Sequence, residues 1–351
     1  MIRWTSNRSK KRLLTLLVFV VFLGAVTLIP LPYYIYQPGT VENLDSYVKV
    51  ENGHRSGQGS FNLTTIYSIE VNNVLTLLYG LSDKDSELRR AEQVRGTLSD
   101  GQYASLLEHM MQTSQNNAIA AALEENGTPV PLAYTGVFVQ SLYPDSKAAD
   151  VVFPGDVIVE TDGRPVTQLS EISDMIRGKK AGDELELVVI RGGERVPVTA
   201  QLYEGTSAAA SEASGSSPRV GLVTENQYEI KPPVNIEYSA SDVGGPSAGL
   251  MFSLEILDQL KEGDLTRGKL IAGTGTISAE GRVGQIGGIR DKVIAAARAG
   301  VEIFFCPADV LATDRNEKDI MDEARKRGYE IAIVPVSTLS DAVHYLEGLE
   351  G

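Results

Sequence analysis

The sequence predicts an α/β (α+β) layered domain in its C-terminal part, a smaller β-rich domain before it, and one apolar transmembrane helix at the N-terminus. Three observations carry this prediction. Helical and strand patterns alternate after Ser247, the stretch 131–205 is rich in strand and turn signals, and an apolar run extends from Leu13 to about Ile35. Such alternation is typical of helices packed on a sheet, and the apolar run is long enough for a bilayer core of ~30 Å.

The C-terminal alternation is regular. Leucines recur at helical spacing from Leu250 to Leu260, so a helix with a buried face follows Ser247. The strand expected earliest in the chain covers 59–67, and mostly helical structure is expected over 86–125. The elements expected after the leucine-rich helix are a strand ending at Ile277, a helix from Ile289, a strand at Val301, a helix near Asn316 to Arg327, a strand from Glu330 to Val336 and a helix to Leu349.

The N-terminus combines a basic tail with the apolar run. Residues 1–12 hold five basic and no acidic side chains, and residues 13–36 form the expected anchor. Basic residues before a span favour a cytoplasmic N-terminus, so everything after the anchor is expected outside the cell membrane. A cleaved signal peptide is the alternative, although 24–27 is a poor cleavage site. The tyrosines expected in the interfacial aromatic belt are Tyr33, Tyr34 and Tyr36.

Composition narrows the classes of function. The formal charge is −14, and since the first twelve residues contribute +5, the remaining residues carry −19. Such an acidic exterior argues against nucleic acid as a partner. The single cysteine, Cys306, excludes an internal disulfide and lies in an apolar stretch typical of a core strand.

The sequence does not support a metal or a cofactor. It contains no His-Glu-x-x-His motif and no cysteine–histidine cluster. The segment Gly263 to Lys269 resembles a phosphate-binding loop, but Leu270 stands where the motif needs Ser or Thr, and a strand follows the segment instead of preceding it. We therefore expect no metal, no cofactor and no ATP.

The segment Gly244 to Gly249 predicts a nucleophilic serine. Ser247 lies where a glycine-rich turn becomes a helix, and the free N–H groups of a helix N-terminus can stabilise an oxyanion. A glycine at 249 would leave room for a substrate carbonyl. The backbone groups expected to support the oxyanion belong to Gly245, Pro246, Ala248 and Gly249.

Ser247 needs a base, and lysine is the better candidate. The three histidines, His54, His109 and His344, have ordinary polar or amphipathic surroundings. Lys292 begins a helix among small and apolar residues, and burial lowers the pKa of a lysine from ~10.4. The neighbouring Asp291 would oppose this shift only if its carboxylate pointed at the amine, and adjacent helical residues face different directions.

Both motifs resemble the proteolytic domain of the Lon family. In that family a Gly-Pro-Ser-Ala-Gly serine and the lysine ending a Gly-Gly-(Leu/Ile)-x-x-Lys segment form a dyad, which corresponds here to Ser247 and Lys292. The resemblance also implies that Thr274 orients the lysine amine, while Thr276 replaces the usual glutamate. It includes the loop 281–288 and runs from about Val220 to the C-terminus.

Other interpretations compete with the dyad. Taken singly, Ser247 fits a simple helix cap and Lys292 a solvated helix lysine. The segment 245–249 also satisfies the Gly-x-Ser-x-Gly elbow of α/β-hydrolases, and His344 follows it in the required order, which would make an esterase. The elbow needs a strand running directly into it, and 239–244 is a poor strand end. Because the two motifs occur together in the family's order, we favour the dyad.

The region 131–205 resembles a bacterial PDZ domain. Its signature is Pro-Gly-Asp-Val-Ile at 154–158 followed by Asp-Gly-Arg-Pro-Val at 162–166. In that family the C-terminus of a peptide adds as a strand, and loop N–H groups hold its carboxylate. Residues 206–218, rich in Ser, Ala and Gly, are expected to form a flexible linker. The strand expected to accept the peptide comprises Gly136, Val137, Phe138 and Val139.

Together these features predict a membrane-anchored, extracytoplasmic, ATP-independent serine endopeptidase. A Lon-type peptidase domain at 219–351 is expected to act on peptides or on small or unfolded proteins, with the PDZ domain recruiting them. The segment 37–130 is assigned to the peptidase fold, because the PDZ unit interrupts the peptidase domain in PDZ-bearing relatives. A homo-oligomer is left open, and a non-catalytic PDZ receptor is the alternative function.

Overall fold

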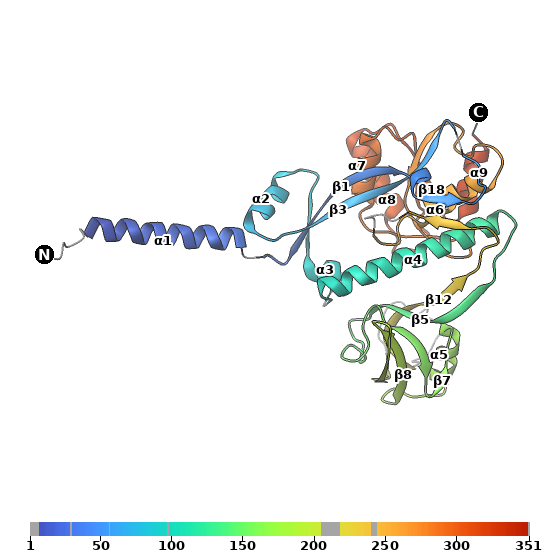
Figure 1. Cartoon of the computed structure of the whole chain (residues 1–351), viewed down its shortest axis with the longest axis horizontal. Helices are drawn as coiled ribbons and strands as arrows, with labels where there is room; N and C mark the ends of the chain where they lie inside the picture. The colour runs from blue at the N-terminus through green and yellow to red at the C-terminus, as the bar shows by residue number, and fades with distance from the viewer. Residues whose placement is uncertain are drawn as a thin grey trace.

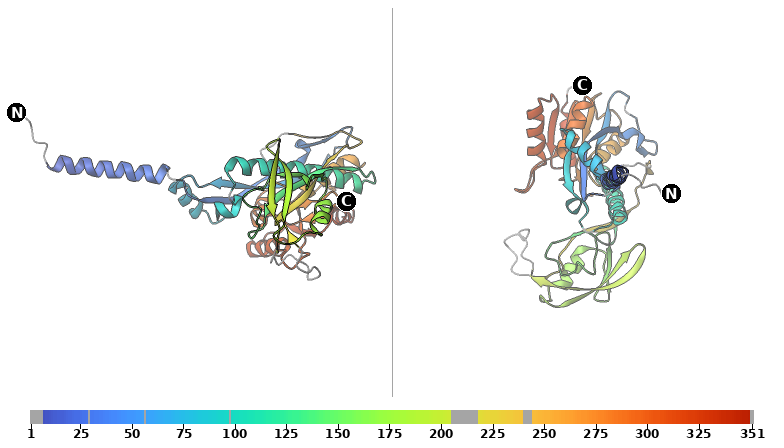
Figure 2. Two further views of the ribbon diagram at one scale, coloured as in Figure 1. Left: turned by 90° about the horizontal axis from the view of Figure 1, so that it is seen from below. Right: turned by 90° about the vertical axis from the view of Figure 1, so that its left-hand side faces the viewer.

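The computed structural model describes residues 7–28, 30–55, 57–96, 98–204, 218–239 and 244–349. Helix α1 (Asn7–Leu28) projects from a body in which one long helix, α4 (Asp100–Glu125), runs between a layered α/β domain and a smaller β domain (Figures 1 and 2). The linker predicted at 206–218 lies outside the described residues except for its last position.

The layered domain is built on one six-stranded sheet. The strands β18, β17, β14 and β3 pair in parallel. At the other edge, β1 pairs antiparallel with β3, and β4 pairs antiparallel with β1. Strand β3 from the early part of the chain pairs in parallel with β14, so residues on both sides of the β domain share this sheet. In spatial order the strands are β18 (Ala332–Val336), β17 (Ile303–Pro307), β14 (Leu270–Gly273), β3 (Ser60–Glu70), β1 (Tyr33–Asn43) and β4 (Glu87–Arg90).

Helices cover both faces of this sheet. On one face the core contains residues of α4, α6 (Gly249–Leu260) and α9 (Leu339–Glu347), and on the other it contains residues of α7 (Ile289–Arg298) and α8 (Asn316–Arg327). Alternate residues of β17 point to opposite cores, because successive strand residues face opposite sides. Phe305 contributes to the first core, and Phe304 and Cys306 to the second. Cys306 is fully buried, which confirms its prediction as a core residue.

Short elements complete the domain. Strand β2 (Val48–Val50) pairs with β13 (Ile236–Tyr238), and β15 (Thr276–Ile277) pairs with β16 (Val283–Gly284). The 3-10 helix η1 (Leu44–Ser46) and the helices α2 (Val74–Ser82) and α3 (Ala91–Arg95) lie along the early part of the chain.

The β domain is a second sheet with its own core. Strand order is β12-β5-β6-β8-β9, with the short β7 beside β6, and helix α5 packs over it. The strand β12 belongs to this sheet, although the sequence assigned 219–351 to the peptidase domain. The elements are β5 (Leu132–Leu142), β6 (Val157–Thr161), β7 (Arg164–Pro165), α5 (Leu169–Ile176), β8 (Glu184–Arg191), β9 (Glu194–Gln201) and β12 (Leu222–Ile230), with β10 (Tyr203–Glu204) paired to β11 (Pro218–Arg219).

Helix α4 contacts both domains. Its C-terminal half is buried against α6, while its N-terminal half packs through Leu106 and Met110 against Phe138 of β5. The two domains therefore share one element that lies beside both cores.

The predicted anchor at 13–36 is wrong at its outer end. Helix α1 ends at Leu28, and Tyr33 to Tyr36 belong to β1, where Tyr34 is buried and Arg89 stacks on the ring of Tyr36. The tyrosines are thus part of the peptidase sheet and not an interfacial belt. Within the described parts of the chain, no helix is both long and apolar enough to traverse a bilayer.

Candidate active site

Ser247 lies in the turn that leads into α6. Gly245 has a φ of 88°, a conformation that favours glycine, and this bend brings the chain from the loop to the helix. Helix α6 begins at Gly249 with Ala248 as its cap residue, so Ser247 precedes the first helical turn. The carbonyl of Ser247 accepts hydrogen bonds from the Gly275 N–H at 2.8 Å and from Thr274 Oγ1 at 2.9 Å. These two contacts hold the turn against the end of β14.

Lys292 reaches Ser247 from the opposite side of the sheet. It lies in the first turn of α7, and its Nζ is 2.7 Å from Ser247 Oγ and 2.9 Å from Thr274 Oγ1. The lysine is 3% exposed and Thr274 is fully buried. Because the Thr274 hydroxyl donates to the Ser247 carbonyl, its oxygen is directed to the lysine and fixes the position of the amine.

The surroundings of Lys292 favour the neutral amine. Burial lowers its pKa to about 7, since a charged ammonium loses its hydration there. Asp291 does not oppose this shift: its carboxyl faces a different charged environment that includes Glu87 and Arg89. Burial, with the negative charge of Glu87 as a smaller cause, raises the pKa of Asp291 to about 6. A lysine that is largely neutral near pH 7 can accept the proton of a serine hydroxyl.

The structure corrects the predicted role of Gly249. A Cβ at this position would lie 2.7 Å from Cγ2 of Ile277 and 2.8 Å from Oγ of Ser114. Glycine is therefore required for close packing of α6 against α4 and β15, and not to admit a substrate carbonyl. The N–H groups of Gly249 and Leu250 donate to the carbonyls of Pro246 and Gly275, respectively.

Ser247 opens into a cleft of about 770 Å³. Helix α4, the β15–β16 hairpin and two strands of the β domain form its walls. Ser114 donates to the carbonyl of Pro246 at 3.0 Å, and the Asn117 amide donates to the carbonyl of Ile277 at 2.7 Å. The lining side chains outside the dyad include Met110, Thr113, Ser114, Asn117, Gln140, Glu225, Thr276, Ser278, Arg282 and Gln285.

Sequence reasoning missed the contribution of α4 to this cleft. The one available signal was the pair Ser114 and Asn117, polar residues three apart beside the small, buried residues Ala118 and Ala121. This spacing puts them on one face of a helix. Nothing in the local pattern shows that this face meets the turn before α6, 132 positions away from Ser114.

The three histidines lie outside the cleft that contains Ser247. None of the three lines its cleft, and His109 stacks on the ring of Phe138 with 3.8 Å between centroids. His344 lies in α9, and the His54 N–H donates to the Gln259 carbonyl. The geometry therefore pairs Ser247 with lysine and does not supply the histidine that an esterase elbow needs.

Thr276 stands where the family pattern has a glutamate. It pairs with Gly284 in the β15–β16 hairpin and lines the cleft, whereas Thr274 alone of the two hydrogen-bonds Lys292.

The predicted peptide-accepting strand is wrong. Gly136 to Val139 lie in β5, whose two edges are already paired: Val137 opposes Asn226 of β12 on one side and Ile158 of β6 on the other. A strand with both edges hydrogen-bonded cannot accept a peptide. The sequence did not show this because β12 follows β5 by some 80 positions and fills the edge that the local pattern left open.

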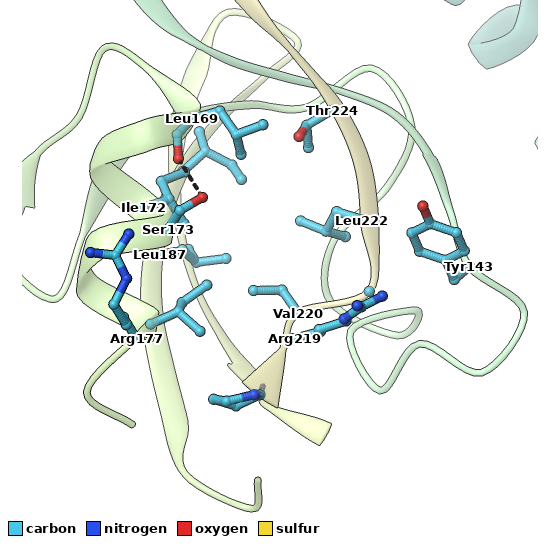
Figure 3. A pocket seen from close by; sticks show the side chains of 14 residues that line it. Tyr143, Leu169, Ile172, Ser173, Arg177, Leu187, Arg219, Val220, Leu222 and Thr224 are labelled. Carbon is cyan, nitrogen blue, oxygen red and sulfur yellow. Dashed lines mark hydrogen bonds between the residues drawn. The ribbon is translucent and has the colours of Figure 1, made fainter. Parts of the chain in front are cut away.

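The structure instead has a groove between α5 and the outer strand β12. Its volume is about 420 Å³, and apolar side chains of Leu169, Ile172 and Leu222 point into it (Figure 3). Segment 218–221, which precedes β12, closes one end and brings Arg219 beside the groove (Figure 3). β12 ends the sheet on the side of this groove, so its outer edge can pair with another strand there.

Comparison with known proteins identifies two kinds of domain in this chain. The Lon protease (S16) C-terminal proteolytic domain matches residues 174–347, and a PDZ domain matches residues 111–202. Lon protease from Neorickettsia sennetsu is 28% identical over 65% of this chain and 27% of its own length. Lon protease from Azospirillum brasilense is 33% identical over 46% of this chain and 19% of its own length. The chain thus spans less than a third of the length of these relatives.

A solved PDZ domain of the SdrC-like protein from Listeria monocytogenes is 30% identical, with a TM-score of 0.23, over 27% of this chain and 93% of that one.

The fold and the site define a serine peptidase domain. That domain is of the Lon type, and it is combined here with a PDZ domain. Strands β1 and β3 lie outside both matched ranges, although they form part of the peptidase sheet.

Proposed function

We propose that this chain is an ATP-independent endopeptidase that is attached to a membrane and cleaves peptides outside the cytoplasm. One observation carries the catalytic part of the proposal: a buried lysine amine lies 2.7 Å from the hydroxyl of a serine that opens into a cleft. Cleavage of a quenched peptide by the full chain, and its loss on replacing Ser247 or Lys292, tests the proposal.

The proposed reaction uses the dyad in two steps. Neutral Lys292 takes the proton of Ser247 Oγ as the oxygen attacks the peptide carbonyl, and the ammonium then protonates the leaving amine. Water deprotonated by the same amine hydrolyses the acyl-enzyme and restores the serine. Thr274 holds the amine in place throughout. The oxyanion would be held by N–H groups of the turn before α6, at Ser247 and Ala248, because those of Gly249 and Leu250 serve backbone carbonyls.

Independence from ATP is part of the proposal. The phosphate-loop-like segment Gly263 to Lys269 is a compact turn between α6 and β14, in which Asp264 accepts hydrogen bonds from Thr266 and from the Gly268 N–H. A carboxylate in that position disfavours phosphate. Without an unfolding motor, the substrates would be short, extended or loosely folded chains.

The groove between α5 and β12 is the proposed docking site for the C-terminus of a substrate. A peptide strand added to β12 would place alternate side chains among Leu169, Ile172 and Leu222, and its carboxylate toward segment 218–221 and Arg219. Docking would raise the effective concentration of substrate at Ser247 without changing the chemistry.

Blocking this groove is expected to reduce recruitment selectively. Ser173 is exposed and lines the groove, so Ser173→Trp fills it without disturbing the core. We expect cleavage of substrates with a docked C-terminus to fall by about tenfold, and cleavage of a short unstructured peptide to stay unchanged. Ser170→Trp, at an exposed residue of the same helix outside the groove lining, is the matched control. Equal processing by both variants would exclude the groove from recruitment.

Membrane attachment and location outside the cytoplasm are proposed from α1. Its apolar side chains are exposed to solvent, for example Leu13 at 68% and Phe19 at 59%. The basic residues Lys10, Lys11 and Arg12 precede them. The helix projects away from both domains (Figures 1 and 2). Burial of these side chains in lipid would remove them from water.

A fusion experiment tests the location. We expect the full chain to sediment with membranes, a variant lacking residues 1–28 to become soluble, and a reporter that folds only outside the cytoplasm to be active when fused after Gly351. A second reporter that is active only in the cytoplasm is the control at the same fusion point. Activity of the cytoplasmic reporter alone would reverse the proposed topology.

A further inference from the structure

The cleft that contains Ser247 has a wall supplied by the PDZ domain. Gln140 of β5 and Glu225 of β12 line the same cavity as Ser247. The two strands are neighbours in the PDZ sheet, and Gln140 Nε2 donates to Glu225 Oε2 at 2.7 Å. The PDZ sheet therefore brings a carboxylate to the catalytic cleft, held in place by an amide.

Glu225 has no cationic partner among the described residues that line the cleft. Two charged side chains, Glu225 and Arg282, belong to its described lining. Arg282 is 73% exposed and pairs with Glu280 at 3.2 Å. Glu225 is half-buried, and the neutral amide of Gln140 is its hydrogen-bond partner; among the described residues, no lysine or arginine forms an ion pair with it.

The carboxylate of Glu225 has hydrogen-bond acceptor sites that Gln140 does not fill. Its two oxygens offer about four acceptor sites, of which the amide of Gln140 fills one. Partial burial raises the pKa of Glu225, because the charged form loses hydration there and the hydrogen bond from Gln140 offsets only part of this effect. A ligand with a positively charged donor would satisfy both the charge and the remaining acceptor sites.

We propose that Glu225, positioned by Gln140, is a specificity-determining residue that selects a lysine or arginine side chain of the substrate close to the scissile bond. This inference rests on the peptidase activity proposed above. A basic side chain gains a charge-assisted hydrogen bond in the cleft, whereas an acidic side chain at the same position meets a like charge.

The inference changes the expected role of the PDZ domain. Besides docking a peptide terminus in its own groove, the domain forms part of the subsite that reads the residue near the cleaved bond. Its two contributions lie on the same strand, since Leu222 and Thr224 face the docking groove and Glu225 faces the catalytic cleft. Deleting 135–202 would accordingly remove Gln140 and alter the cleft itself.

Paired peptides and charge variants test this subsite. Internally quenched peptides that differ only in carrying lysine, glutamine or glutamate at each position around the scissile bond are cleaved by the full chain, and kcat/KM is compared within each set. We expect one position to favour lysine over glutamine by on the order of tenfold, the size of one charge-assisted contact. In Glu225→Gln this ratio is expected to approach one, and in Glu225→Lys the preference is expected to turn to glutamate.

Glu229→Gln is the matched control, because Glu229 is an exposed residue of the same strand outside the cleft lining. It should keep the lysine preference of the unmodified chain. The same peptide sets are titrated against the Ser247→Ala protein with and without Glu225→Gln, so binding is measured independently of cleavage. If the unmodified chain cleaves none of the peptides, the proposed function fails, and the binding titration still decides the role of Glu225. If the Glu225→Gln variant keeps the same preference for lysine as the unmodified chain, the inference is overturned.

Discussion

Replacing Ser247 by alanine, or Lys292 by methionine, is expected to reduce peptide cleavage by roughly four to six orders of magnitude. Ser247 Oγ forms the new bond and Lys292 Nζ moves the proton, and the two atoms are 2.7 Å apart in a buried site. When two residues act as one catalytic unit, removing either of them abolishes nearly all of the rate enhancement. The double variant should therefore be no less active than either single variant. Single-turnover assays with a quenched peptide measure the effect.

The stability of the Lys292 variant separates catalysis from folding. The folded-state pKa of Lys292 is about 7, below its ordinary value of 10.5. Between these values the unfolded chain binds a proton that the folded chain does not, so this group makes stability rise with pH over that window. Lys292→Met removes this penalty and should unfold at no lower temperature than the unmodified chain at pH 7. The exposed Lys318→Met in α8 is the control. Near-normal turnover by Lys292→Met would exclude lysine as the base.

The pH profile is the second large effect that we expect. The base must be neutral, so kcat/KM should fall tenfold per pH unit below about 7 and level off above it, which makes a difference on the order of a hundredfold between pH 5 and pH 7. The direction follows from burial, which disfavours the charged form and so extends the neutral form down to near-neutral pH. A stopped assay across pH 5–9 measures the acid limb.

Two variants test the assignment of that limb. Asp291, whose pKa is raised to about 6, is the alternative group whose titration could produce the acid limb. Asp291→Asn should leave the limb in place. Simultaneous replacement of His54, His109 and His344 should leave it unchanged as well, because none of these residues lines the cleft of Ser247. A limb that disappears in the triple variant would assign the base to histidine.

The candidate catalytic residues could be predicted from the local sequence. A serine on a glycine-rich turn and a lysine among small apolar residues predict a nucleophile and a base, because turn geometry and burial are set largely by near neighbours. The structure brings Ser247, Lys292 and Thr274 within hydrogen-bond distance of one another. The alternation of helices and strands after Ser247 likewise follows from local hydrophobic periodicity.

Edge pairing was decided by the tertiary structure. The sequence placed the peptide beside Gly136 to Val139, but β12 occupies that edge from beyond the linker, and the groove lies on the outer side of β12. The anchor was placed at 13–36, but Tyr33 to Tyr36 pair with β3 and β4. In both cases the local pattern shows that a segment is extended or apolar. It does not show which other strand forms hydrogen bonds with the backbone of that segment.

The cleft was also decided by the tertiary structure. Ser114 of α4, Glu225 of β12 and Ser247 come from distant parts of the chain and meet because α4 packs against both domains. By itself the sequence indicated which side chains are candidates for nucleophile and base, since reactivity depends on residue type and nearby burial. Only the three-dimensional structure decided which side chains surround the substrate, since those contacts join segments whose separation along the chain leaves no local trace.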